Sequence, residues 1–269
     1  MKIAIVSYGD PEAVRVRKIM LNRLAKTDIQ CEPKHPDIVI SIGGDGTLLT
    51  AFNKYQDQLD HVRFVGIHTG HLGFYTDWRN FEVDDLLTSL QHDSGQLVAY
   101  PLLQIDVTYS DGQAQHMVAL NESALRQKTK TMVSDVYIND RFFESFRGDG
   151  LCASTPTGST AYNKSVGGAV MDPKISGFQL TELASLNNRV YRSLGSPIIL
   201  GTESQVTLRI HDDSDSLLTC DRRVVEWNTD EHHLSEVAYR VADQPIRFAK
   251  YRHTSFWDRV HESFIGGRK

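Results

Sequence analysis

A short turn at residues 43–46 combines three glycines with one carboxylate. The sequence "ISIGGDGTLLTAF" passes from an apolar stretch, which favours a buried strand, through the turn and into an amphipathic stretch. Glycine-rich turns between a strand and a helix expose backbone N–H groups that bind phosphate. Asp45 would repel such an anion, and neither a Walker A motif nor GxGxxG is present. The turn is therefore either a phosphate site in which Asp45 has a separate role, or a plain turn in which Asp45 caps a helix.

A longer segment at residues 146–173 is rich in small hydroxylated side chains. It repeats Gly-Asp-Gly at 148–150 and continues as "LCASTPTGSTAYNKSVGGA". Many hydrogen-bonding groups around one aromatic ring suit a nucleoside, because the ring can stack and the ribose can be hydrogen-bonded. A polar surface loop would explain any one of these residues but explains the set poorly. The polar residues are Thr155, Thr157, Ser159, Thr160, Tyr162, Asn163 and Ser165.

Two further segments place polar residues beside expected strands. In "HTGHLGFYTDW" (68–78), neither a carboxylate nor a third ligand is arranged near His68 and His71, so we interpret them as loop residues rather than a metal pair. "ALNESAL" (119–125) places Asn121 and Glu122 inside a β run. Polar residues in an apolar strand need partners or have a function.

Alternating strand and helix signals predict that the first hundred residues form an α/β unit. Strands are predicted at 2–8, 36–42 and 62–68, and helices at 11–26, 48–59 and 81–91. This order with short connections is typical of a parallel sheet covered by helices. After Pro101, alternating apolar residues and hairpin turns predict mostly antiparallel β structure.

The last stretch, "SFWDRVHESFI", predicts a helix. Ser255 and Asp258 have capping-box spacing, and Phe256, Val260 and Phe264 share one face. A lone apolar helix after a β domain must pack somewhere. It could return to the N-terminal layer or form an oligomer contact.

Composition and charge exclude several classes of function. The 269 residues carry a formal net charge of −5, which argues against a nucleic-acid surface. Three cysteines without CxxC spacing argue against a disulfide framework or a zinc site and fit a reducing compartment. The sequence has no stretch that resembles a signal peptide or a membrane span. We therefore expect a cytoplasmic protein that binds neither nucleic acid nor membrane.

Taken in order, the segments GGDGTLL, HTGHLGF, ALNE and RGDGLCASTPTGSTAYNKSVGGA resemble those of NAD kinases, particularly the short form found in Gram-positive bacteria. The resemblance covers nearly the whole chain. The GGDG turn is shared with phosphofructokinases and diacylglycerol-type lipid kinases, whereas TPTGSTAY with Asn-Glu upstream is strongly specific. The family implies an α/β domain over 1–100 that carries GGDG, a mostly antiparallel, β-rich NAD-binding domain over 101–249, and a C-terminal segment, 250–269, that returns to the first domain.

NAD kinases transfer a phosphoryl group from ATP, or from polyphosphate in some members, to the 2′-hydroxyl of the adenosine ribose of NAD. By resemblance, Asp45 is the catalytic carboxylate that takes the proton of this hydroxyl, and Tyr162 stacks on a ring of NAD. The substrate-binding residues implied in the same way are Gly44, Gly46, Phe74, Asn121, Glu122, Arg147, Asp149, Thr160, Ala161, Tyr162, Asn163, Lys164, Ser165, Ala184 and Arg222.

One position departs from the commoner family pattern. Many members have Asp-Gly-Gln where this chain has Asp221, Arg222 and Arg223. A cation at this point could meet a phosphate or remain solvated. The resemblance also implies a divalent cation, Mg²⁺ or another, whose protein ligands we do not assign, and a homodimer or homotetramer. The alternatives are a lipid or sugar kinase with the same GGDG turn, and a non-catalytic dinucleotide sensor.

Overall fold

The computed structural model describes residues 1–70, 72–227, 232–252 and 255–266. The chain forms two compact units. The first contains residues 1–100 together with the chain from residue 244 onward, and the second contains residues 101–243. Among the described residues, none of the helices has the length and apolar character needed to cross a membrane.

The first unit is a mixed, mostly parallel sheet with helices. Its strands are β1 (Lys2–Ser7), β2 (Gln30–Cys31), β3 (Ile38–Ile42), β4 (Arg63–His68), β5 (Trp78–Arg79), β6 (Leu97–Tyr100) and β19 (Ile246–Ala249). Its helices are α1 (Pro11–Leu24), α2 (Asp45–Tyr55), α3 (Val83–Gln91) and α5 (Phe256–Val260), with a 3₁₀ turn at Gln56–Gln58 and a π-helical turn at His261–Ile265.

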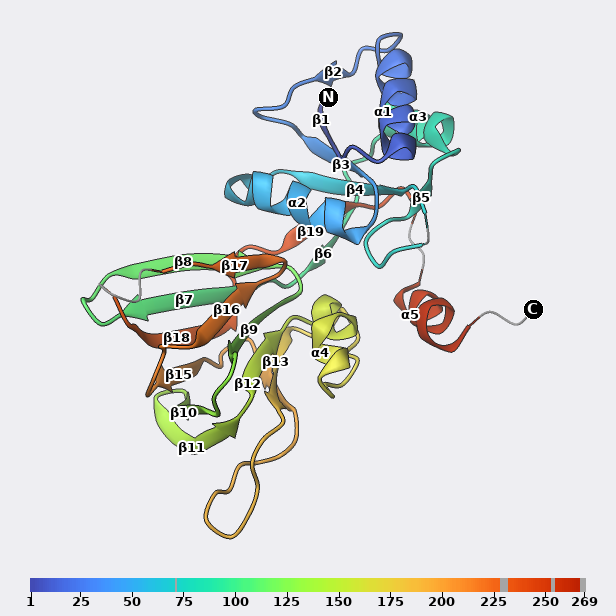
Figure 1. The fold of residues 1–269 in the computed structure, drawn as a ribbon. Coiled ribbons are helices and arrows are strands. Elements are labelled where there is room, and N and C mark those ends of the chain that lie inside the picture. The colour runs from blue at the N-terminus through green and yellow to red at the C-terminus, as the bar shows by residue number, and fades with distance from the viewer. Residues whose placement is uncertain (71, 228–231, 253–254, 267–269) are drawn as a thin grey trace. The chain divides into compact units, whose positions relative to one another are not determined.

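The strand order of this sheet is β2-β1-β3-β4-β19-β6, with β5 beside β4, and only β6 runs antiparallel to its neighbour. The apolar sides of α1 and α3 join β1, β3 and β4 in one buried cluster, whereas α2 packs against β1 and β3 outside it. Figure 1 shows β1 and β3 between α2 and the α1–α3 pair. The helices and strands predicted from periodicity are therefore confirmed, and β3, from which the GGDG turn leaves, is buried at every position.

The chain re-enters the first sheet earlier than predicted. Residues 246–249, assigned to the β-rich domain from the sequence, form β19, which pairs with β4 and β6 of the first sheet. The alternating pattern of this strand does not reveal which sheet it joins, because both neighbours are distant in sequence.

The C-terminal helix packs on the first unit. Arg259 is 3% exposed and pairs with Asp77. The predicted capping box is absent, because Ser255 occupies the cap position without a side-chain hydrogen bond to the helix.

The second unit is built from antiparallel strands. These are β7 (Leu103–Tyr109), β8 (Ala114–Ala119), β9 (Glu122–Gln127), β10 (Met132–Ile138), β11 (Arg141–Gly148), β12 (Gly150–Ser154), β13 (Gly177–Leu183), β14 (Ile198–Gly201), β15 (Val206–Ile210), β16 (Ser216–Cys220), β17 (Arg223–Val225) and β18 (Leu234–Val241). Between β12 and β13 lie a 3₁₀ turn, Thr157–Thr160, and the short helix α4, Tyr162–Ser165.

Within the described residues, these strands form two six-stranded sheets in the orders β11-β10-β15-β18-β7-β8 and β14-β13-β12-β9-β16-β17. Apolar residues from both sheets build one core. The predicted hairpin at 139–140 joins β10 to β11, and Asn139 and Asp140 both have positive φ, as tight hairpin turns require. In the second sheet β9 pairs with β12, which places Glu122 opposite Ser154. This pairing brings two of the predicted polar segments together.

Candidate functional site

The GGDG turn starts helix α2, but Asp45 is not its cap. Gly44 occupies the cap position, and Asp45 is the first residue of the helix. Gly43 has a φ of +148°, and a Cβ at this residue would lie 2.2 Å from Oγ1 of Thr47. Glycine is therefore needed for the sharp exit from β3, and the helix-cap interpretation of Asp45 is wrong.

The Asp45 carboxylate instead binds the loop that follows β4. Its Oδ2 accepts a hydrogen bond from the backbone N–H of Phe74 at 2.8 Å, and its Oδ1 accepts one from Tyr75 at 3.0 Å. A Cβ on Gly73 would lie 2.3 Å from Oδ1 of Asp45, so only glycine admits the carboxylate at this distance. Two segments singled out in the sequence, GGDG and HTGHLGF, thus meet at one half-buried carboxylate.

Of the two histidines of this loop, the structure describes His68. Nδ1 of His68 lies 2.9 Å from the carbonyl oxygen of Gly70, a local hydrogen bond that closes the turn. His71 lies outside the described residues. Within the described ranges, no group of three or more His, Cys, Asp or Glu side chains is arranged to hold a metal ion.

In the second unit, Asp221 holds the Asn121–Glu122 segment by its backbone. One oxygen of the Asp221 carboxylate accepts the N–H of Leu120 at 3.0 Å, and the other accepts those of Asn121 at 2.7 Å and Glu122 at 3.2 Å. Asp221 has a φ of +52°. Asparagine and aspartate tolerate this conformation better than other residues with a Cβ. The sequence predicted that Asn121 and Glu122 needed partners but did not identify Asp221.

The turn after β12 packs tightly against the same segment. Oγ1 of Thr155 donates to the carbonyl oxygen of Leu120 at 2.6 Å and accepts the N–H of Gly158 at 2.9 Å. A Cβ on Gly158 would lie 2.0 Å from the carbonyl oxygen of Asn121. The 3₁₀ turn of the TPTGST segment therefore packs directly against the backbone of Asn121.

The side chain of Asn163, which follows this turn, is buried and hydrogen-bonded. It is fully buried, its Nδ2 donates to the carbonyls of Ser159 and Ala169 at 3.3 Å each, and its Oδ1 accepts from Thr181 at 2.8 Å. These bonds use both donors of the amide and one acceptor position of its oxygen. The geometry favours a structural role for Asn163.

Glu122 is a buried carboxyl beside a negative charge. It is 8% exposed, and its Oε2 has no hydrogen-bond partner among the described residues. Burial, and then the charge of Asp221, raise the pKa of Glu122 to about 8, although a hydrogen bond from the backbone of Tyr162 opposes the rise. A buried carboxyl oxygen without a partner is suited to hydrogen-bond a hydroxyl of a ligand, because a hydroxyl can both donate and accept.

This pKa predicts how stability depends on pH. The pKa of Glu122 is about 8 in the folded chain and 4.5 without the fold. Its stabilising contribution is therefore complete below about pH 4.5 and is lost as the pH rises through about 8. We expect the free energy of unfolding of Glu122→Gln to fall less than that of the unmodified protein between pH 5 and 8, because glutamine cannot ionise.

The measurement is denaturant unfolding of both proteins across this pH range. Glu203→Gln is the matched control, because Glu203 is exposed. Glu122→Gln and the unmodified protein share all other titrating groups, so the difference between their two stability curves reports the ionisation of Glu122. Parallel curves for Glu122→Gln and the unmodified protein would contradict the assigned pKa.

A cavity of about 500 Å³ lies in the second unit, beside Tyr162 of helix α4. Three predicted residues line it: Asp149, Tyr162 and Ala184. Arg126, not identified from the sequence, lies beside them; its Nη1 donates to Oη of Tyr162 at 3.3 Å, and its guanidinium carbon lies 5.5 Å from the centre of the ring. Lys128 and Lys130 also line the cavity. The cavity therefore combines an aromatic ring with several cations, as a phosphorylated nucleoside requires.

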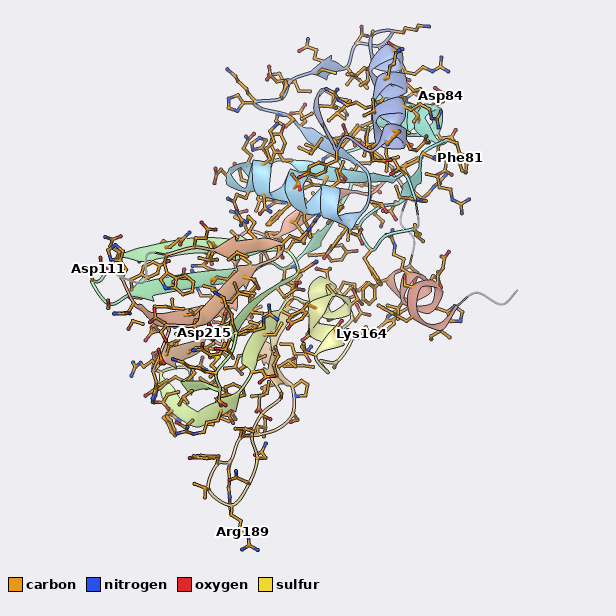
Figure 2. All side chains as sticks on the ribbon, viewed as in Figure 1. Phe81, Asp84, Asp111, Lys164, Arg189 and Asp215 are labelled. Atoms are coloured by element: carbon orange, nitrogen blue, oxygen red, sulfur yellow. The ribbon has the colours of Figure 1, made fainter. Side chains whose placement is uncertain are left out.

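The other predicted residues take several environments. The guanidinium carbon of Arg147 lies 4.2 Å from the centre of the Tyr191 ring. Ala184 has a φ of +47°. Figure 2 shows Lys164 on the short helix α4. Gly44, Lys164, Ser165 and Arg222 are exposed, Gly46 and Ala161 are half-buried, and Thr160 is buried.

The sequence matches two protein-family models and several known proteins. Residues 10–94 match the family described as the ATP-NAD kinase N-terminal domain, and residues 120–249 match the ATP-NAD kinase C-terminal domain. The chain is 57% identical to the NAD kinase of Limosilactobacillus reuteri, with 99% of both chains covered, and 48% identical to that of Enterococcus faecalis, again with 99% of both covered.

Two solved structures share the fold. The crystal structure of yeast NADH kinase complexed with NADH has a TM-score of 0.83 at 18% identity, covering 99% of this chain and 87% of that one. An NAD kinase from Archaeoglobus fulgidus in complex with ATP has a TM-score of 0.70 at 22% identity, covering 93% of this chain and 94% of that one.

Proposed function

This chain belongs to the NAD kinase family, and we propose that Asp45 accepts the proton of the 2′-hydroxyl of the adenosine ribose of NAD during phosphoryl transfer. The enzyme phosphorylates NAD with ATP. What supports the role of Asp45 is the pair of hydrogen bonds from Phe74 and Tyr75 that fix its carboxylate at the start of α2.

A fixed carboxylate meets a definite chemical need. A ribose hydroxyl is a weak nucleophile, and a base within hydrogen-bond reach accelerates its attack about 10²- to 10⁴-fold. Each oxygen of Asp45 accepts one backbone N–H, which leaves lone pairs for the hydroxyl proton. The remaining catalysis of phosphoryl transfer comes from positioning and from charge neutralisation.

The second unit supplies the residues that we propose bind NAD. The buried, unpartnered Oε2 of Glu122 is suited to a ribose hydroxyl, and the ring of Tyr162 offers a stacking surface at the cavity. We assign Asn121, Asp149, Thr160 and Ala184 to the same substrate. The exposed guanidinium of Arg222 remains a candidate for a phosphate contact.

Because no group of three or more described His, Cys, Asp or Glu side chains could hold a metal ion, a divalent cation would enter as part of the substrate. Mg²⁺ retains waters and binds phosphate oxygens readily. We propose that Mg²⁺ enters with ATP and neutralises the triphosphate, while the N–H groups of the glycine turn bind its oxygens. We also propose a homodimer or homotetramer, which sedimentation measurements would identify.

Replacement of Tyr162 by alanine should weaken NAD binding about 10- to 100-fold, the range expected when one stacking aromatic ring is lost. Calorimetric titration of NAD measures the effect. Tyr137→Ala is the matched control. The guanidinium of Arg209 lies over the Tyr137 ring, as that of Arg126 does over Tyr162, but Tyr137 lies on β10 and does not line the cavity. Equal affinities for Tyr162→Ala and Tyr137→Ala would remove Tyr162 from the site.

One assay tests the activity against its alternatives. The purified protein is supplied with ATP, Mg²⁺ and NAD, and an NADP-specific dehydrogenase reports the product. We expect signal with ATP and NAD together and none when either is omitted. Absence of signal despite NAD binding would favour a dinucleotide sensor, and phosphorylation of a lipid or sugar instead of NAD would favour the other kinases with a GGDG turn.

A further inference from the structure

The loop that holds Asp45 is itself held by the C-terminal helix. Nη1 of Arg259 donates to the carbonyl oxygen of Gly73 at 2.6 Å and to that of Thr76 at 3.3 Å, and Nη2 pairs with the carboxylate of Asp77. Gly73 directly precedes Phe74 and Tyr75, whose N–H groups bind Asp45. One guanidinium thus binds three points of the five-residue loop 73–77.

The helix also contacts the loop through aromatic rings. The Phe74 ring lies 5.8 Å from Phe256 and 6.0 Å from Phe264, measured between ring centres. Arg259 and these two phenylalanines all belong to the segment 256–265. The backbone and the side chain of the loop are therefore fixed by the same helical segment.

We propose that Arg259 is a positioning residue for the reaction: by fixing loop 73–77, it orients the Asp45 carboxylate. The inference rests on the proposed role of Asp45. A guanidinium suits this task because it presents several N–H donors in a rigid plane and remains charged. Arg259 is 3% exposed, so its hydrogen bonds compete little with water.

Arg259→Met tests the proposal by keeping most of the side-chain volume while removing every donor. We expect kcat to fall about 10²-fold, the loss that a misplaced catalytic group causes. KM for NAD should remain within about twofold, because the altered contact does not bind substrate. Arg259→Lys should recover part of the loss, since an ammonium can pair with Asp77 but cannot bind both carbonyls in the same plane.

Arg252→Met is the matched control. Arg252 precedes the same helix, pairs with Glu82 and stacks over Trp78, but makes none of the contacts with loop 73–77 described above. Its kcat should stay close to that of the unmodified enzyme. If Arg252→Met and Arg259→Met lose equal activity, or if Arg259→Met keeps a normal kcat, the proposal is wrong.

A double variant distinguishes positioning from general structural damage. If Arg259 acts through Asp45, adding Arg259→Met to Asp45→Asn should lower the residual kcat little further, whereas independent effects would multiply. Multiplying losses would overturn the proposal. If Asp45→Asn alone keeps normal turnover, the failure lies in the proposed role of Asp45.

If Arg259→Met does not fold, Asp77→Asn is the second variant, because it weakens the ion pair between Arg259 and loop 73–77. It should also lower kcat, and a normal kcat in the folded Asp77→Asn variant would overturn the proposal.

Discussion

Replacing Asp45 with asparagine should lower kcat about 10²- to 10⁴-fold, because the amide cannot accept the hydroxyl proton. The substitution also brings an NH₂ group towards one of the two backbone donors of Phe74 and Tyr75, whose N–H groups lie 2.8 and 3.0 Å from the carboxylate. We expect the protein to fold and to bind NAD with nearly unchanged affinity. Steady-state kinetics with the coupled NADP assay and calorimetry with NAD separate the two properties.

Asp84→Asn is the control for loss of a negative charge on the same unit. Asp84 lies on α3 at the surface (Figure 2), where it pairs with Arg23 and is 70% exposed. We expect its kcat to match that of the unmodified enzyme. Turnover of Asp45→Asn near the unmodified level would exclude Asp45 as the base. Loss of NAD affinity equal to the loss of kcat would instead indicate a binding role.

Replacing Asp221 with alanine should destabilise the protein by about 3 kcal/mol or more and weaken NAD binding. The change leaves the N–H groups of Leu120, Asn121 and Glu122 without their acceptor, and each orphaned buried donor costs about 1–3 kcal/mol. It also places a β-carbon without a compensating polar group at a φ of +52°. Denaturant unfolding measures the first effect and calorimetry with NAD the second.

Asp140→Ala separates these two causes. Asp140 has a φ of +61° and lies in the exposed turn between β10 and β11, so its replacement reports the conformational cost alone. The additional loss in Asp221→Ala measures the contribution of the carboxylate. If both variants lose the same stability, the three hydrogen bonds contribute little and the assigned role of Asp221 is wrong.

The sequence predicts those parts of the fold that depend on local patterns. Helical spacing in 11–26 and strand alternation after residue 101 each reflect one buried face, and both predictions are confirmed. The sheet to which β19 belongs was not predictable in this way, because its partners β4 and β6 are set by long-range pairing. The absent capping bond of Ser255 has a similar cause: the spacing permits the bond but does not require it.

The candidate site shows the same division. Asp45 stood out as a carboxylate in a glycine-rich turn, and Asn121 and Glu122 stood out as polar residues in an apolar strand. By contrast, Asp221 and Arg259 bind backbone groups that are distant in sequence. The residues that flank Asp221 and Arg259 in the sequence do not predict which backbone groups these side chains bind. Gly73 could have been noticed, since a glycine beside Phe74 in a predicted site signals close approach. The approaching carboxylate, however, belongs to Asp45 at the start of α2, which is distant in sequence.

The insertion of β19 between β4 and β6 has a consequence for the order of folding. Tyr100, at the end of β6, pairs with Ile246 at the start of β19, so the chain leaves and re-enters the first sheet at adjacent strands. The second unit is continuous in sequence, so it can form while the first sheet still lacks its internal strand β19. Closing a contact of such long sequence separation is slow. The sheet that precedes Asp45 is therefore expected to complete its native pairing last, after the continuous second unit has formed between β6 and β19.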